Sequence, residues 1–174
     1  MPHLRLCVAL ALSTAGGPSA LFDLTWSRVD FARGTIRLAR ETGKKSKKGR
    51  ATVLITEGAR AELAEAKRAA ETKFVPEWRG EPISTVKGSF EKACARACFD
   101  GVTPHVLRHT AGVWVAEAGP LMTEIAQYLG HTDPRVTFRV YARYSPEYLR
   151  GASGALELVP AGTNVPTLSV RRTS

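Results

Sequence analysis

Residues 103–110 read TPHVLRHT and place two histidines and an arginine within one stretch of predicted helix. Threonine followed by proline is typical of a helix start, with threonine as the N-cap and proline in the first turn. His105, Arg108 and His109 then share one side of the helix, because residues three and four apart are neighbours on its surface. The free amides of a first turn, an imidazole and a guanidinium together favour an anion, above all phosphate.

A zinc site is the competing interpretation of the same stretch. Zinc protease helices also carry histidines four apart, but they need a glutamate beside the first one as general base. Here Val106 follows His105, and the cation of Arg108 would lie against the metal. We therefore expect no metal and no cofactor. A zinc hydrolase built on His105, His109 and His131 remains an alternative that metal analysis of the purified protein would test.

The charge of the chain predicts a polyanionic partner. The 174 residues suffice for one domain, and they carry a formal net charge of +9 with a pI near 9.9. Nucleic acid is the first candidate partner and an acidic membrane surface the second. The excess is concentrated between Arg28 and Arg50, where nine Lys/Arg and two acidic residues give a net charge of +7.

The cysteines and the N-terminal segment indicate in which cellular compartment the protein is expected. Cys7, Cys94 and Cys98 are an odd number without metal-ligand spacing. Cys94 and Cys98 lie four residues apart within an apolar pattern, so we interpret them as reduced core residues of a cytoplasmic protein. Residues 6–12 are uniformly apolar and mimic a signal peptide. The run is too short to span a bilayer, and we expect a buried helix and no membrane association.

The remaining pattern predicts a mainly α-helical domain with a small antiparallel β-sheet, an α+β fold, over residues 1–150. The alternating stretches GTIRLAR and ATVLIT predict a hairpin with the cationic turn ETGKKSKKGR between its strands, after a first strand near 28–31. Residues 74–84 read as a loop, and 151–174 as a loosely ordered tail or one that packs on a neighbour. Helices are expected at 4–14, from 18, from 57 to about 70, near 90–97, and at 103–118, 121–129 and 134–144.

Three short motifs occur along the chain in a characteristic order. HVLR at 105–108 precedes LGH at 129–131, and Tyr141 follows His131 by ten residues in VYARYSPEYL. Together they resemble the catalytic domain of the tyrosine recombinase (phage integrase) family, which has H-x-x-R and L-G-H boxes and a nucleophilic tyrosine nine or ten residues later. The likeness covers roughly residues 3–150 and includes LTWSRVDFARGTIRL at 24–38 and KKSKKGRATVLI at 44–55.

The resemblance implies site-specific DNA recombination by strand cleavage and religation. A tyrosine attacks a DNA phosphodiester and forms a 3′-phosphotyrosine, and surrounding cations stabilise the charge on the phosphate. Carried over to this chain, Tyr141 is the nucleophile and Arg108 the phosphate clamp. His105 takes part in proton transfer near the nucleophile, and His131 donates a hydrogen bond to the phosphate.

The resemblance also assigns the basic hairpin and the partners. The general acid for the leaving hydroxyl is expected at Lys47 or Lys48, with Lys44 and Lys45 left open. The expected partners are double-stranded DNA and further copies of the chain, as a monomer when free and a tetramer on DNA in the cytoplasm at the nucleoid. Basic residues expected to contact DNA are Lys44, Lys45, Arg50 and Arg135.

For several other residues we expect a structural role and no direct part in catalysis. Tyr144 and Tyr148 are alternative reactive tyrosines, but only Tyr141 has the family spacing. His109 is expected to support its helix turn and not to touch phosphate. Trp26 and Trp114 are expected in the core.

The chain departs from the family at its first catalytic arginine. The family box reads T-G-x-R-x-x-E, whereas the aligned stretch here is STAGGPSAL, with Gly17 at the arginine position and Ala20 at the acidic one. Losing one charge-stabilising contact of this kind commonly costs on the order of 3–4 kcal/mol of barrier. A catalytically impaired DNA-binding remnant is therefore the second hypothesis. Because full-length recombinases also grip DNA with an N-terminal helical domain that we do not find here, we expect low isolated DNA affinity.

Overall fold

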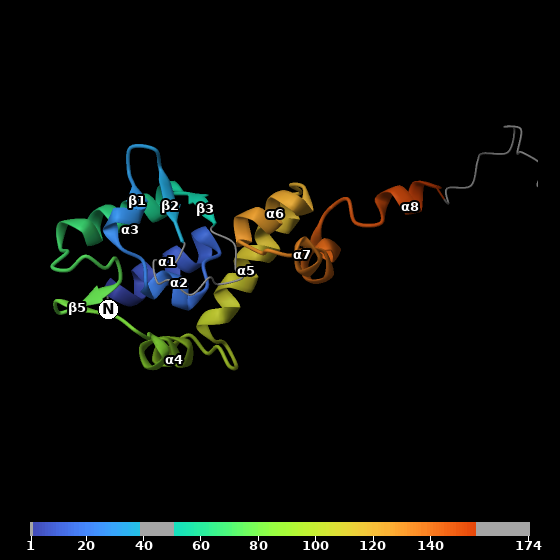
Figure 1. Ribbon diagram of the computed structural model, residues 1–174. Helices are drawn as coiled ribbons and strands as arrows, with labels where there is room; N and C mark the ends of the chain where they lie inside the picture. The colour runs from blue at the N-terminus through green and yellow to red at the C-terminus, as the bar shows by residue number, and fades with distance from the viewer. Residues whose placement is uncertain (1, 39–50, 156–174) are drawn as a thin grey trace, which may run out of the picture.

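The computed structural model describes residues 2–38 and 51–155, and it has the predicted mainly helical α+β architecture (Figure 1). Helix α1 lies at the centre and packs against α3 and α5. A small sheet and α3 cover one side of α1, while α5, α6 and α7 form the other part of the molecule. The helices are α1 (Pro2–Thr14), α2 (Pro18–Phe22), α3 (Glu57–Arg68), α4 (Lys87–Arg96), α5 (Pro104–Glu117), α6 (Met122–Leu129), α7 (Pro134–Tyr141) and α8 (Arg150–Ala155), with short 3₁₀ turns η1 (Trp26–Arg28) and η2 (Ala142–Tyr144).

Helix α1 is buried on most of its surface, as its apolar run predicts. Leu10 is completely buried and belongs to a core cluster that also includes Leu24 and Leu63. Because this helix is surrounded by α3, α5 and the sheet-bearing segment, its sequence shows little amphipathic periodicity. Its buried residues are Leu4, Leu6, Cys7, Leu10, Ala11 and Thr14.

The sheet has three antiparallel strands in the order β1 (Val29–Asp30), β2 (Thr35–Arg37) and β3 (Thr52–Leu54). Ile36 pairs with both Val29 and Val53, and the Ile36 and Val53 side chains are buried in the same core cluster as α1. The predicted hairpin is confirmed, since alternate residues face the core and the solvent. Its cationic turn lies outside the described residues.

A second core cluster joins α5, α6 and α7. Ala111 of α5, Ile125 and Leu129 of α6, and Tyr141 of α7 are buried in it. Gly130 ends α6 in the left-handed conformation, with φ of 66°, which glycine adopts at low cost. The Asp133 carboxylate then caps α7 by accepting the Arg135 amide at 2.9 Å. The short connection between these two caps lets α6 and α7 pack together, with Leu129 and Tyr141 in the same cluster as Ala111 of α5.

Two expected core residues lie at the surface. Trp114 is 55% exposed, because the buried face of α5 carries only small residues, Ala111, Gly112 and Ala116. Cys98 is exposed with φ of 56°, whereas Cys94 is half-buried. Helix α4 ends at Arg96, so the helical spacing from Cys94 does not extend to Cys98. Trp26 packs partly buried against the core as predicted, and Cys7 is buried within the predicted N-terminal helix.

Local structure differs from expectation in three further places. Thr103 has the extended backbone of an N-cap, but among the described residues its side chain caps no amide. Residues 74–84 contain a small hairpin, β4 (Glu77–Trp78) and β5 (Glu81–Pro82), whose turn has positive φ at Arg79 and Gly80. The segment expected to be loosely ordered begins in the helix α8.

No helix within residues 2–38 and 51–155 combines the length and apolar character needed to cross a membrane.

Candidate active site

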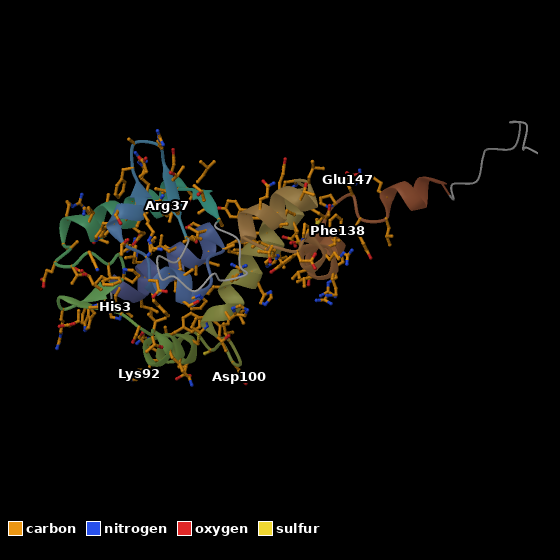
Figure 2. The ribbon with its side chains drawn as sticks, in the orientation of Figure 1. His3, Arg37, Lys92, Asp100, Phe138 and Glu147 are labelled. Carbon is orange, nitrogen blue, oxygen red and sulfur yellow. The ribbon has the colours of Figure 1, made fainter. Side chains whose placement is uncertain are left out.

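Tyr141 lies at the C-terminal end of α7, with its ring pressed against α5. It is only 2% exposed, whereas Phe138, one turn earlier on α7, is 50% exposed and lies at the surface (Figure 2). The ring occupies the space above Gly112. A Cβ at that position would lie 2.6 Å from two carbons of the Tyr141 ring and 2.8 Å from its hydroxyl oxygen. Glycine at 112 therefore permits the close approach of α7 to α5.

The hydroxyl of Tyr141 contacts a histidine that sequence reasoning left aside. The distance from Nδ1 of His109 to the Tyr141 hydroxyl oxygen is 3.1 Å, which is a hydrogen bond. The two rings lie 6.3 Å apart with an interplanar angle of 36°. This contact is additional to the predicted support of its helix turn, and the sequence did not predict it. The spacing of four residues from His105 places His109 on the same side of α5 as that predicted site residue.

Arg108 ties three segments together at the centre of the site. Its Nη1 donates to the carbonyl of Ala15 at 2.6 Å, and its Nη2 donates to the carbonyl of Leu129 at 2.7 Å. These bonds join α5 to the turn after α1 and to the end of α6. Burial lowers the pKa of Arg108 from its ordinary value, and interaction with Tyr141 opposes that shift. An arginine side chain nevertheless remains charged at physiological pH.

The electrostatics of Tyr141 suit a protonated hydroxyl at neutral pH. Burial raises the pKa of Tyr141, the positive charge of Arg108 lowers it, and Tyr144 raises it further, with a net upward shift. The phenol therefore has to lose its proton during any attack on phosphorus, and the cation next to it favours the charge that develops.

The two histidines of the predicted boxes, His105 and His131, contact other side chains of α5 and α7. His105 is exposed, and its ring lies edge-on to the ring of His109 at a centroid distance of 5.0 Å. His131 follows Gly130 and is oriented through a 2.8 Å hydrogen bond between its Nδ1 and the hydroxyl of Thr137, which is fully buried. The described side chains include no group of three or more His, Cys, Asp or Glu placed to hold a metal ion.

The turn that carries Gly17 lies beside Arg108. Ala15, whose carbonyl accepts from Arg108, is buried and has φ of 50°, a conformation that favours glycine. Gly17 itself is extended, with φ of −70° and ψ of 151°, as expected for a residue before proline. Among the described residues, no atom lies within 4 Å of a Cβ built at Gly17, so a side chain has open space there.

Of the remaining basic residues predicted to contact DNA or to act as general acid, one lies within the described residues and the others lie outside them. Arg135 is exposed at the start of α7. The basic residues of the hairpin turn lie outside the described residues, and their assigned roles stay predictions: Lys44, Lys45, Lys47, Lys48 and Arg50.

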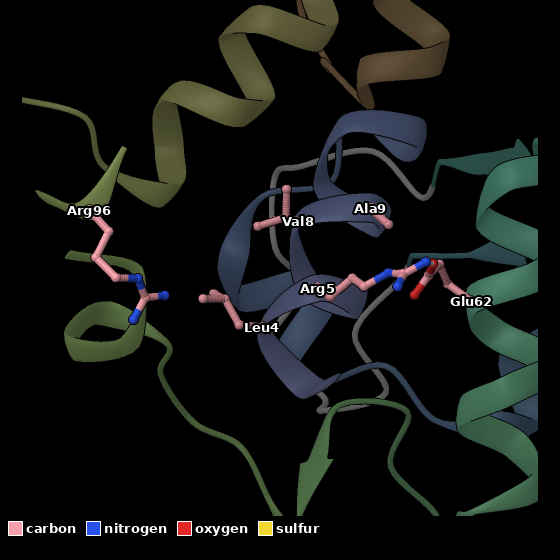
Figure 3. A pocket seen from close by; sticks show the side chains of 6 residues that line it. All are labelled: Leu4, Arg5, Val8, Ala9, Glu62 and Arg96. Carbon is pink, nitrogen blue, oxygen red and sulfur yellow. Dashed lines mark hydrogen bonds and ion pairs between the residues drawn. The ribbon is translucent and has the colours of Figure 1, made fainter. Parts of the chain in front are cut away.

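A surface pocket on another part of the molecule contains none of these groups (Figure 3). It has a volume of about 440 Å³ and lies between α1, α3 and α4. The ion pair between Arg5 and Glu62, at 2.6 Å, borders it. The candidate site around Tyr141 lies elsewhere, where α7 packs against α5. The residues lining the pocket are Leu4, Arg5, Val8, Ala9, Glu62 and Arg96.

A comparison with known protein families supports the family resemblance that the order of the boxes predicts. The family model described as the phage integrase family matches residues 2–147. The chain belongs to this family. As a phage integrase family member, it shares its fold with solved tyrosine recombinase catalytic domains. None of the curated proteins compared with the chain matched it.

Three solved structures illustrate the likeness. The Tn1549 transposon integrase, in complex with a circular intermediate DNA, is 21% identical with a TM-score of 0.71, over 87% of this chain and 58% of that one. XerA recombinase is 22% identical with a TM-score of 0.71, over 91% and 58% of the two chains. The catalytic domain of bacteriophage HP1 integrase is 28% identical with a TM-score of 0.62, over 87% and 80%. This family member therefore corresponds to little more than half of the Tn1549 and XerA chains.

Proposed function

We propose that this chain acts in site-specific DNA recombination, with Tyr141 as the nucleophile that cleaves and rejoins a DNA strand. The observation that carries the proposal is the hydroxyl of Tyr141, hydrogen-bonded to His109 at 3.1 Å and interacting electrostatically with Arg108. Membership of the phage integrase family and the fold shared with a DNA-bound transposon integrase support it.

The proposed reaction needs neither a metal nor an external energy source. The Tyr141 oxygen forms a bond to phosphorus as the bond from phosphorus to the 5′-oxygen breaks, which yields a 3′-phosphotyrosine and a free 5′-hydroxyl. The phenol proton passes to a nearby base, and the leaving oxygen takes a proton from Lys47 or Lys48. Because the phosphodiester is exchanged for another phosphate ester, a second DNA hydroxyl can reverse the step.

Arg108 is proposed to hold the scissile phosphate. Its two bonds to carbonyls use two of the five N–H donors of a guanidinium and fix its orientation in advance. A preorganised cation stabilises the charge of the transition state without reorganising during the reaction. His105 would assist proton transfer and His131 would donate to the phosphate, with its ring held by Thr137.

The partners follow from the same chemistry. We propose double-stranded DNA as the substrate, a tetramer on two duplexes as the active assembly, and a free monomer. The net charge of +9 supports a polyanionic partner. A cytoplasmic location at the nucleoid is part of this proposal.

A nicked suicide DNA substrate tests the proposal, because loss of a short fragment traps the covalent adduct. We expect an adduct that resists denaturation and disappears in Tyr141→Phe. Tyr144→Phe is the matched control and should keep the adduct, since that ring is exposed and follows the active tyrosine by one turn. An adduct that persists in Tyr141→Phe would contradict the assignment.

A catalytically impaired DNA-binding remnant is the second candidate function. Two observations favour it: Gly17 stands at the family's arginine position, and the Tyr141 side chain is almost fully buried. This hypothesis predicts salt-sensitive DNA binding with no adduct, even after Gly17→Arg. An adduct formed by either protein rules it out.

A further inference from the structure

His109 stands outside the H-x-x-R and L-G-H boxes, yet its imidazole meets the reactive hydroxyl. Its Nδ1 lies 3.1 Å from the Tyr141 oxygen, a normal hydrogen-bond distance. The residue is exposed on α5, so substrate can reach it, whereas the tyrosine ring is buried beneath it against Gly112. The geometry points to His109 as a catalytic residue that accepts the hydrogen bond of the Tyr141 hydroxyl and removes its proton during attack.

Proton acceptance at Nδ1 requires a defined form of the ring. In neutral imidazole one nitrogen accepts and the other carries the proton, so the accepting form of His109 has its proton on Nε2. A tyrosine phenol is protonated at neutral pH, and burial raises the pKa of Tyr141 further. Attack therefore needs a base within hydrogen-bond reach of the hydroxyl, and His109 Nδ1 meets that geometric requirement.

The neighbouring imidazole gives the proton a route away from the site. The His105 ring lies edge-on to the His109 ring at a centroid distance of 5.0 Å, and His105 is exposed, so it would pass the proton on toward solvent.

In the proposed cleavage step, one proton moves to His109 as one phosphorus–oxygen bond forms and another breaks. The O–H bond of Tyr141 breaks, its proton binds Nδ1 of His109, and the phenolate oxygen bonds to phosphorus. The 5′-oxygen leaves with the electron pair of its bond to phosphorus and is protonated by the hairpin lysine. This inference rests on the proposed function, because it concerns the same nucleophile.

Variants at position 109 separate the hydrogen bond from proton removal. His109→Phe keeps an aromatic ring at this position but removes both the hydrogen bond to Tyr141 and the base that accepts its proton. His109→Asn places an amide near the position of Nδ1, so it preserves a hydrogen bond without a good base, whereas His109→Gln extends toward the position of Nε2. Thr110→Val is the matched control on α5, since the Thr110 hydroxyl bonds only to its own helix in the described structure, at Val106.

Adduct formation on the nicked DNA should follow a specific order. We expect His109→Phe to slow it at least about a hundredfold, the low end for general base catalysis, with unchanged DNA affinity. His109→Asn should react faster than His109→Phe, and His109→Gln should resemble His109→Phe. The inference fails if His109→Phe stays within twofold of the parent, if His109→Gln outperforms His109→Asn, or if Thr110→Val slows the reaction equally.

A fluorine resonance of Tyr141 reports on its contact with His109 without requiring DNA cleavage, so it tests this inference independently of the proposed function. In protein labelled with 3-fluorotyrosine, the Tyr141 fluorine resonance is identified by its loss in Tyr141→Phe. It should shift in His109→Phe, return toward the parent position in His109→Asn and stay in Thr110→Val. An unmoved resonance in His109→Phe overturns the inference whether or not adducts form. Absence of adducts in the parent and in Gly17→Arg, with the resonance shifting as expected, overturns the proposed function instead.

Discussion

Position 17 holds glycine where the resemblance to the family predicts an arginine. We expect Gly17→Arg to fold normally, because the backbone there is already extended and a Cβ meets no described atom within 4 Å. The turn beside it presents the Ala15 carbonyl to Arg108, so an arginine at 17 would bring a second guanidinium close to the same phosphate. Adduct formation should rise at least about tenfold, equivalent to roughly 1.4 kcal/mol of barrier.

Sulfate binding provides a second measurement for the same variant. A second cation near Arg108 should increase affinity for sulfate and make the thermal stability of Gly17→Arg more dependent on sulfate concentration. Gly58→Arg, at another open position on α3, is the control for added charge. A folded Gly17→Arg protein with unchanged sulfate binding and no gain in adduct would contradict the prediction.

The lysine assigned as general acid can be tested by the chemistry of the leaving group. Lys47→Ala or Lys48→Ala should slow cleavage of ordinary DNA, because the leaving 5′-oxygen needs a proton. A substrate with sulfur at the 5′-bridging position should be cleaved at nearly the parent rate, since a thiolate leaves without protonation. Equal losses on both substrates would show that the lysine acts only through its charge.

At the scale of elements, the site depends on how closely α7 approaches α5. Gly112→Ala would place a methyl group 2.6 Å from the Tyr141 ring, so the ring has to move away from α5 and from His109. We expect a loss of about 1–3 kcal/mol in the free energy of unfolding, typical of overpacking, together with reduced adduct formation. Urea unfolding and the suicide substrate provide the two measurements.

Gly58→Ala on α3 is the matched control for this change. Among the described residues, no atom lies within 4 Å of a Cβ there, so the substitution should be neutral or stabilise the protein by up to about 1 kcal/mol through helix propensity. If Gly112→Ala matched Gly58→Ala in stability and retained full activity, the packing of Tyr141 on α5 would not control the nucleophile.

At the scale of the whole molecule, excess positive charge should dominate DNA binding. Affinity should fall steeply as salt rises from roughly 50 to 200 mM, because each phosphate contact releases a counterion and contributes about 0.9 to the log–log slope. Replacing Lys44, Lys45, Lys47 and Lys48 together by Gln should flatten that slope. Arg5→Gln, whose charge is already paired with Glu62, is the control. An affinity that does not depend on salt would refute the prediction.

Alkaline pH should destabilise the folded chain through its buried acids. Burial raises the pKa of Cys7 to about 12, and it also raises the pKa of Tyr128 and Tyr141. The unfolded chain loses the thiol proton near pH 8.5, so this contribution to stability is complete below that pH and lost on the way to about 12. The loss amounts to at most about 1.4 kcal/mol per pH unit for each group.

Melting temperatures between pH 7 and pH 11 would check the thiol contribution. Cys7→Ala should be less stable than the parent at neutral pH, because it leaves a small cavity, but its stability should decline less from pH 9 upward. Parallel declines in the two proteins would show that Cys7 does not contribute.

Local sequence patterns predict the types of element and their order, and they propose four residues for the site: His105, Arg108, His131 and Tyr141. Helical spacing and capping signals are local, and the HVLR and LGH boxes with Tyr141 are fixed by distance along the chain, so they could be read without coordinates. Local patterns also placed Gly17 in an extended turn, since proline restricts the residue before it.

Which side chains contact one another depends on how the helices pack in three dimensions. The hydrogen bond of His109 to Tyr141, the space that Gly112 leaves for the tyrosine ring, and the two carbonyls that orient Arg108 all join residues from different elements. Trp114 was misplaced for the same reason: small residues fill the buried face of α5 because another helix packs close against it. Periodicity shows that a residue can face a neighbour, but the identity of the neighbour depends on how the helices pack.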